Sequence, residues 1–189
     1  MKNAVVGGLL GGIVLFVWGA VSHMALPIGE AGVRSMPPAQ EPAVLGEFRG
    51  ALKERALYVF PGMARDHQPT DEEQRAWAEK YKSGYGIVTY DPAPGEFSFP
   101  AHLITEFASN TAAAILAAVV LGWLAASAGY GQRVLAATLI GLIMGLDVDV
   151  SQWNWYAFPT PYVLAQLADH AIGWTLAGLV LARFTRPAS

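Results

Sequence analysis

The chain has no cysteine and few charged residues over its 189 positions. Without cysteine it can form no disulfide, no thiolate metal site and no covalent haem attachment. Charged residues make up 14% of the sequence, whereas soluble domains contain about 25%. Hydrophobic residues make up 53%. This composition indicates a protein that lies largely in a lipid bilayer.

The sequence also lacks a basic run and any nucleic-acid-binding signature. Its formal net charge is -3, which argues against a nucleic-acid partner. No residues have the spacing of a catalytic triad or of a known metal motif. We therefore assign no catalytic residue, and a non-enzymatic role is favoured.

Four apolar runs are long enough to be transmembrane helices. They cover residues 4–26, 103–127, 134–150 and about 162–184. A helix of about 20 residues crosses the roughly 30 Å hydrocarbon core. The predicted fold is an all-α membrane bundle of four transmembrane helices with a small extracytoplasmic α+β insertion between helices 1 and 2. Its domains are helix 1 (1–26), the cap (27–101), and helices 2–4 with a short tail (102–189).

The first apolar run has two interpretations. Lys2 precedes it, and Ala20-Val21-Ser22 resembles a signal-peptidase site, so the run could be a cleaved signal peptide. Its length and the GxxxG pairs Gly7/Gly11 and Gly8/Gly12 favour a retained helix, because small residues let a second helix approach closely. The third run carries a similar pair, Gly141/Gly145.

The cap differs sharply from the rest of the chain, with eight of the twelve Lys/Arg and eleven of the fifteen Asp/Glu residues in 27–100. Within it we predict a helix over 42–57 and a strand over 57–60. A second helix starts at a capping box, Thr70 to Glu73, and a second strand covers 85–90. The polar loop tip Arg65-Asp66-His67 is interpreted as solvated. A segment of about 70 residues that has no disulfide or structural metal buries only a limited core. We therefore expect it to pack against the bundle or against a partner.

The charges that flank the short connections predict the topology. Four crossings place the basic residues Lys2, Arg133, Arg183 and Arg186 on one side, which the positive-inside rule makes cytoplasmic. Both termini are then cytoplasmic and residues 27–101 extracytoplasmic. The Trp153–Pro161 turn lies outside as well, and its aromatic residues suit an interfacial belt.

Six ionisable residues interrupt the outer halves of the predicted helices: His23, Glu106, Asp147, Asp149, Asp169 and His170. A charge inside a bilayer costs a few kcal/mol even on lenient scales, so these residues need partners. On a helix Asp147 and Asp149 are about 200° apart, so both face one site only if the helix breaks near Gly145. Asp169 and His170 are about 100° apart. We therefore predict a polar outer pocket to which each helix contributes one group.

Three interpretations of these residues stay open. They could be structural, bonding to each other, to tryptophan indoles and to the cap. His23, Glu106, one of Asp147 and Asp149, and Asp169 or His170 could instead bind a divalent metal ion such as iron, zinc or manganese. In the third interpretation the cluster relays protons or binds a small polar solute.

Three motifs carry a resemblance: Ser22-His23-Met24, Tyr58-Val59-Phe60-Pro61-Gly62-Met63 and Trp153-Asn154-Trp155-Tyr156-Ala157-Phe158-Pro159. With them the chain resembles a group of uncharacterised bacterial inner-membrane proteins. The resemblance implies a four-helix protein of the bacterial inner membrane and no particular activity.

The leading functional hypothesis is a non-enzymatic accessory, structural or assembly subunit of a larger membrane complex. It rests on the small size, the GxxxG faces of helices 1 and 3, the marginal cap and the lack of a catalytic motif. The expected partners are the bilayer and other membrane-protein subunits or a second copy of the chain. The alternatives are a metal-binding protein or enzyme that uses the polar cluster, and a small proton-coupled or solute transporter.

Overall fold

The computed structural model describes residues 2–63, 66–124 and 126–185. Arg65 and Arg186, which entered the predictions above, lie outside the described residues. The chain divides into two compact units. The bundle unit comprises Met1–Val33, Ser98–Val150 and Thr160–Ser189, and the cap unit comprises Arg34–Phe97 and Ser151–Pro159.

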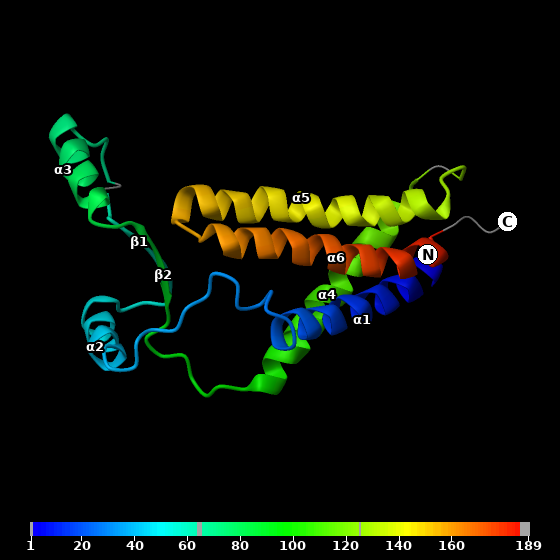
Figure 1. The fold of residues 1–189 in the computed structure, drawn as a ribbon, viewed down its shortest axis with the longest axis horizontal. Coiled ribbons are helices and arrows are strands. Elements are labelled where there is room, and N and C mark those ends of the chain that lie inside the picture. Colours follow the sequence, from blue (N-terminus) through cyan, green and yellow to red (C-terminus); the bar gives the residue numbers. More distant parts are fainter. Residues whose placement is uncertain (1, 64–65, 125, 186–189) are drawn as a thin grey trace. The chain divides into compact units, whose positions relative to one another are not determined.

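Four long helices dominate the structure (Figure 1): α1 (Lys2–Met24), α4 (Phe99–Gly122), α5 (Tyr130–Tyr156) and α6 (Thr160–Phe184). Among the described residues these four are long and apolar enough to cross a membrane. A two-stranded sheet lies between the first and second of them in the sequence. The predicted fold class is confirmed, and the chain is a multi-pass membrane protein.

The helix bounds differ from the predictions in instructive ways. The third helix does not break at Gly145 and continues through Tyr156, so Trp153 and Trp155 stand on a helix rather than in the turn. No proline or glycine interrupts residues 146–156, and nothing in that stretch stops a helix. The connection to α6 is short, and it begins at Ala157, whose φ of 61° is left-handed as at many helix C-termini.

Helix α1 presents two glycine faces to two different neighbours. A Cβ placed on Gly8 would lie 2.5 Å from Ile115 Cγ1, and one on Gly12 would lie 2.5 Å from the Cα of Thr111, so α1 and α4 cross in near-backbone contact. On the other face, a Cβ on Gly11 would lie 2.9 Å from Leu181 Cδ2 of α6. Both predicted GxxxG pairs of α1 are thus used for close helix packing.

The α5–α6 hairpin is packed in the same way. A Cβ on Gly141 would lie 2.5 Å from Trp174 Cδ1, and one on Gly178 would lie 2.8 Å from the Cβ of Ala137. The hydroxyls of Thr138 and Thr175 are 2.8 Å apart across the same interface. These contacts bear on the prediction that the GxxxG faces serve partner docking. The GxxxG faces pack against helices of the same chain, so they give no support to docking of a partner.

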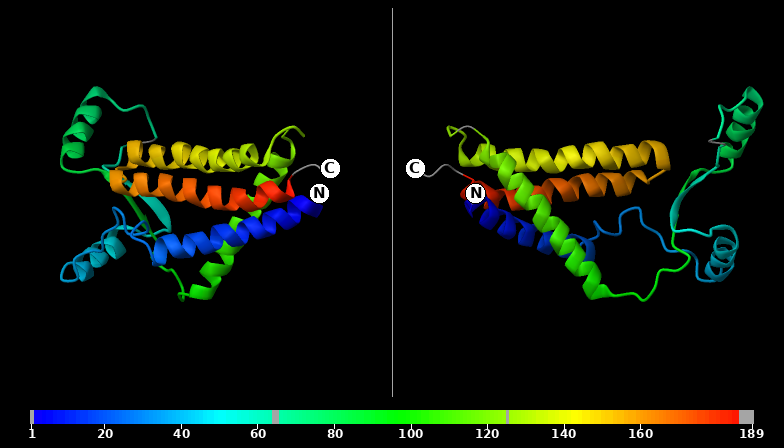
Figure 2. Two further views of the ribbon diagram at one scale, coloured as in Figure 1. Left: turned by 45° about the vertical axis from the view of Figure 1, so that its right-hand side comes forward. Right: turned by 180° about the vertical axis from the view of Figure 1, so that it is seen from behind.

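The two ends of the bundle unit are packed very differently. At one end, all four helices meet, and Phe184 of α6 lies against Gly7 of α1 (Figure 1). We call this the closed end. Its core consists mainly of small residues and leucine, namely Ala114, Ala117, Ala118, Leu121, Ala137, Ala177 and Leu181. From there α4 crosses α1 and diverges from the α5–α6 hairpin (Figure 2). We call the opposite end the pocket end.

A buried arginine ties the closed end together. The guanidinium of Arg133, 0% exposed, donates to the carbonyls of Leu121, at the end of α4, and of Thr185, which follows α6. It also donates to the Ala128 carbonyl in the turn before α5. Carbonyls at helix C-termini have no partner within their own helix, and a cation is well placed there. In the sequence Arg133 stands out only as a charge that flanks a helix, so this role was not predicted.

The cap unit contains α2 (Glu41–Ala51), β1 (Ala56–Phe60), α3 (Asp71–Lys82) and β2 (Gly86–Tyr90), with β1 and β2 antiparallel in the register Ala56↔Tyr90 to Phe60↔Gly86. The capping box is confirmed: Thr70 Oγ1 accepts from the amide of Glu73, whose carboxylate accepts from the amide of Thr70. Helix α2 ends six residues earlier than predicted, since Gly46 and Gly50 lower its helix propensity.

Few contacts hold the cap elements together. Phe48 of α2 packs edge-on against Tyr90 of β2, with ring centroids 5.7 Å apart. The indole of Trp77 in α3 donates to the carbonyl of Pro61 at 3.0 Å. Neither α2 nor α3 contains a buried residue. Among the described residues, the cap elements therefore share no buried apolar core.

Candidate functional site

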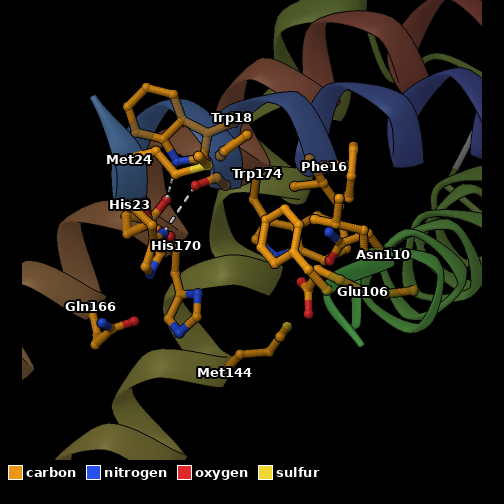
Figure 3. A pocket seen from close by; sticks show the side chains of 18 residues that line it. Phe16, Trp18, His23, Met24, Glu106, Asn110, Met144, Gln166, His170 and Trp174 are labelled. Atoms are coloured by element: carbon orange, nitrogen blue, oxygen red, sulfur yellow. Dashed lines mark hydrogen bonds between the residues drawn. The ribbon is translucent and has the colours of Figure 1, made fainter. Parts of the chain in front are cut away.

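A cavity of ≈ 490 Å³ opens at the pocket end of the bundle unit (Figure 3). All four long helices contribute to its wall. Six polar side chains line it: His23, Glu106, Asn110, Gln166, Asp169 and His170. The rest of the wall is apolar and includes four aromatic residues, Phe16, Trp18, Phe99 and Trp174.

The helix packing explains why a cavity forms here. Helices α1 and α4 cross closely at Gly8 and Gly12. Beyond this crossing α4 diverges from the α5–α6 hairpin, so a space opens between them (Figure 2). Two tryptophans partly fill the resulting space. Trp18 of α1 packs onto Gly173, whose added Cβ would lie 2.7 Å from Trp18 Cδ1, and Trp174 packs onto Gly141.

The structure brings four of the six predicted site residues to the cavity wall: His23, Glu106, Asp169 and His170. Gln166, His170 and Trp174 follow one another at four-residue spacing on α6, and all three line the cavity. Asp169 and His170 both reach the wall although they are adjacent in the sequence. The cavity therefore spans more than one face of α6.

The two aspartates of α5 are separated, as the helical geometry requires. Asp149 is 6% exposed, whereas Asp147 is exposed and does not line the cavity. Asp149 Oδ2 lies 3.3 Å from His170 Nε2. Gly145 leaves room for this pair, because a Cβ there would lie 3.2 Å from Asp149 Oδ2 and 3.1 Å from His170 Cδ2. Asp149 and His170 thus form a polar link between α5 and α6.

The other histidines of the long helices bond to their own helix backbone. His23 Nδ1 donates to the Gly19 carbonyl at 3.1 Å and lies 2.8 Å from the Ser22 hydroxyl. His102 Nδ1 donates to the Ser98 carbonyl at 2.8 Å. This bond directs His102 Nδ1 toward the start of its own helix.

The backbone carbonyl of Asp169 has a hydrogen-bond partner on another helix, whereas one oxygen of its carboxylate has none among the described residues. Its carbonyl accepts from the indole of Trp18 at 3.3 Å, which links α6 to α1. Its Oδ1 is enclosed and finds no hydrogen-bond partner among the described residues. An enclosed carboxylate oxygen without a partner is unfavourable. The bond to Trp18 is of the kind that the structural interpretation expected, but the carboxylate itself has no such partner.

The metal interpretation gains no geometric basis from these positions. In residues 2–63, 66–124 and 126–185, no group of three or more His, Asp or Glu side chains is placed to hold a metal ion. Asp149 and His170 supply only two such groups. What the wall does offer is acidic and hydrogen-bonding groups set in an aromatic, apolar surface.

Sequence reasoning missed the apolar part of the wall. Phe16, Met24 and Met144 line the cavity, but in the sequence they are indistinguishable from other apolar residues of their helices. Only the divergence of α4 decides which apolar side chains face an open space. Trp18 and Trp174 carried a weak signal, because large aromatic residues near intramembrane charges often supply a hydrogen bond.

No protein-family model, curated protein or solved structure matches the chain.

Proposed function

We propose that the protein is a non-enzymatic accessory or assembly subunit of a larger membrane complex, and that the cap unit binds another subunit. The four apolar helices serve as the membrane anchor. The cap supplies the recognition surface.

One observation carries this proposal: the sheet of the cap has an uncovered apolar face. Side chains alternate across a strand, and antiparallel partners share a face. Leu57 and Val59 therefore stand on the same face as their partners Thr89 and Ile87, and we call this set the Leu57 face. Leu57 is 51% and Val59 39% exposed. The ring contact between Phe48 of α2 and the sheet uses Tyr90, on the opposite face.

The cap is poorly suited to stand by itself. An isolated two-stranded sheet is marginal in water and needs packing against a further element. Both cap helices lack buried residues, so neither supplies a core. Association with an apolar surface would bury the Leu57 face, and each fully buried aliphatic side chain contributes about 1.5–3 kcal/mol. A partner of complementary shape and apolar character thus has a clear energetic basis.

The location and orientation that we propose follow from the basic flanks. The start of α1 and the end of α6 lie at the closed end, where Phe184 meets Gly7. This supports the placement of Lys2, Arg133 and Arg183 on one cytoplasmic side. We place the cap on the extracytoplasmic side of a bacterial inner membrane, in keeping with the resemblance carried by its motifs.

Purification in a mild detergent tests the proposal. The tagged full-length protein should co-isolate a different membrane protein in stoichiometric amount. Changing Leu57→Asn together with Val59→Asn should remove that protein from the eluate, because the face becomes polar. Met36→Asn is the control, since Met36 is 41% exposed but lies outside the sheet.

Two results would contradict the proposal. One is a homogeneous protein that carries no second polypeptide or only copies of itself. The other is a partner that is retained equally by the Leu57/Val59 double variant and by Met36→Asn.

A further inference from the structure

We infer that the cavity at the pocket end binds an amphiphilic organic ammonium ion, with its cationic head at Glu106 and Asp169 and its apolar part against the aromatic wall. This site is independent of the Leu57 face and goes beyond the proposed function. The inference rests on the size, the charge and the composition of the cavity.

The size suits a small molecule. The cavity measures ≈ 490 Å³, and pockets that bind small molecules have volumes of about 300–1,000 Å³. Its wall also has their usual composition, mostly apolar and aromatic with a few convergent polar groups. An aliphatic chain can pack against Leu15, Phe16 and Met144, which all line the cavity.

The cavity wall carries acidic side chains and no basic side chain that matches them. Glu106 and Asp169 line the cavity, and its wall contains no lysine or arginine. Within the described part of the chain, the hydrogen bond at Glu106 uses its backbone carbonyl, and no bond is seen for its carboxylate. The Asp169 Oδ1 is enclosed and has no hydrogen-bond partner there, so a cation would act on it through its charge. In a poorly polarisable environment such charges attract a cation more strongly than they do in water. A cation in the cavity would offset both.

The two histidines of the wall do not offset these carboxylates. His170 faces Asp149 of α5 at 3.3 Å. His23 donates from Nδ1 to the carbonyl of Gly19 in its own helix. The wall therefore offers these two carboxyl groups no positive charge of its own, and a bound cation would supply it.

The aromatic residues favour an organic cation over an inorganic one. Tryptophan faces attract ammonium groups, and this attraction strengthens when water is excluded. Trp18 and Trp174 both line the cavity (Figure 3). A metal ion would instead need three or more closely placed ligands, which no His, Asp or Glu group among the described residues provides. An ammonium ion with an alkyl chain satisfies the charged and the apolar parts of the wall together.

Quenching of tryptophan fluorescence tests this inference with a matched series of probes. The full-length protein in dodecyl maltoside is titrated with 11-bromoundecylammonium, 11-bromoundecanol and 11-bromoundecanoate, which share a chain and differ in head charge. The ammonium probe should quench saturably at a concentration about tenfold lower than the alcohol, and the carboxylate should be the weakest. Trp18→Phe with Trp174→Phe should abolish the saturable part of the quenching.

Carboxylate variants locate the head group. Glu106→Gln and Asp169→Asn should each bring the ammonium curve close to the alcohol curve. Asp147→Asn removes a carboxylate from a spanning helix but outside the wall, and should leave the curve unchanged. Competition by phosphatidylethanolamine would identify a lipid head group as the source of the ammonium, and competition by octylammonium alone would identify a free amine.

Three results would overturn the inference. Coinciding ammonium and alcohol curves would show that the head charge plays no part. Unchanged ammonium quenching in both Glu106→Gln and Asp169→Asn would remove the proposed contacts. Saturable quenching that survives the loss of Trp18 and Trp174 would place the probe elsewhere.

Discussion

The closed end and the pocket end of the bundle unit are built from the same four helices, yet they differ in what fills the space between them. At the closed end, glycine and alanine bring the helices into near-backbone contact, and Arg133 binds the helix termini. At the pocket end, large aromatic and polar side chains stand between diverging helices and leave a cavity. Small residues thus bring the helices into close contact at one end, and the divergence of α4 leaves the other end open.

This difference separates stability from recognition within one small bundle. In a bilayer, helices associate through close packing and hydrogen bonds rather than through the hydrophobic effect. The closed end supplies both, so the pocket end can keep unpaired polar groups without loss of the fold. Substitutions at the closed end should therefore lower stability, whereas substitutions at the pocket end should mainly change binding.

The largest loss of stability is expected from substitution of Arg133. Arg133→Met leaves the carbonyls of Leu121 and Thr185 without their donor in a buried site, and an unsatisfied buried polar group costs about 1–3 kcal/mol. The variant should lose roughly 3 kcal/mol or more of stability. Gel filtration after heating in detergent should show a clearly lower midpoint of aggregation. A midpoint equal to that of the unmodified chain would show that Arg133 does not hold the closed end.

Two glycines of α1 provide a matched comparison of the two ends. Gly12→Ala places a methyl group 2.5 Å from the backbone of Thr111 and should cost about 1–3 kcal/mol through overpacking. Gly19→Ala at the pocket end meets nothing within 4 Å and should be neutral or stabilising by up to about 1 kcal/mol. The same heating assay checks both. Equal destabilisation by the two variants would remove the distinction between the ends.

A smaller loss of stability is expected from a substitution at the pocket end, Trp18→Phe. Trp18→Phe removes the donor to the carbonyl of Asp169, and intramembrane hydrogen bonds contribute about 0.6 kcal/mol on average. The heating midpoint should fall slightly, and by less than in Gly12→Ala. A loss as large as that of Arg133→Met would mean that this end carries the stability of the bundle.

The smallest effect on stability is expected in the cap, where a fall in pH should weaken the N-terminal cap of α3. This extends the comparison to a region whose helices contain no buried residue. Hydrogen bonds from Thr70 and then from His67 hold the pKa of the Glu73 carboxylate below its ordinary value of 4.5. The ionised form is the one that caps α3. Its stabilisation is therefore complete above the ordinary pKa and is lost as the pH falls through the lowered pKa of the folded state.

Hydrogen exchange of the peptide that starts α3, corrected for intrinsic rates, measures this loss. Exchange should speed up at acidic pH in the unmodified chain. Glu73→Gln keeps a similar shape but cannot ionise, so it should show no such pH dependence. The same acid response in both chains would exclude Glu73 as its cause.

The sequence was informative wherever local chemistry decides the structure. Apolar run length predicted the four helices, Thr70 and Glu73 predicted the capping box, and helical geometry predicted the separation of Asp147 from Asp149. Near-backbone packing of the GxxxG glycines was also foreseen, because a missing side chain permits close approach in any context. Which helix each glycine contacts was not foreseen, and here the contacts stay within the chain.

The rest depends on the three-dimensional path of the helices. The role of Arg133 arises because the ends of α4 and α6 converge beside the start of α5, which no local pattern encodes. The pairing of Asp149 with His170 likewise needs the register of two antiparallel helices. The apolar wall of the cavity follows from the divergence of α4, so Phe16 and Met144 acquire their position only in the folded bundle.

Cysteine labelling tests the contrast between the two ends most directly, because the natural chain contains no cysteine. Single substitutions at Asn110 and Gln166 place a thiol on the cavity wall, and those at Ala118 and Ala137 place one at buried positions of the closed end. With a small maleimide, Asn110→Cys and Gln166→Cys should react readily in the folded protein. Ala118→Cys and Ala137→Cys should react only after denaturation. Equal labelling of all four in the folded state would contradict the account.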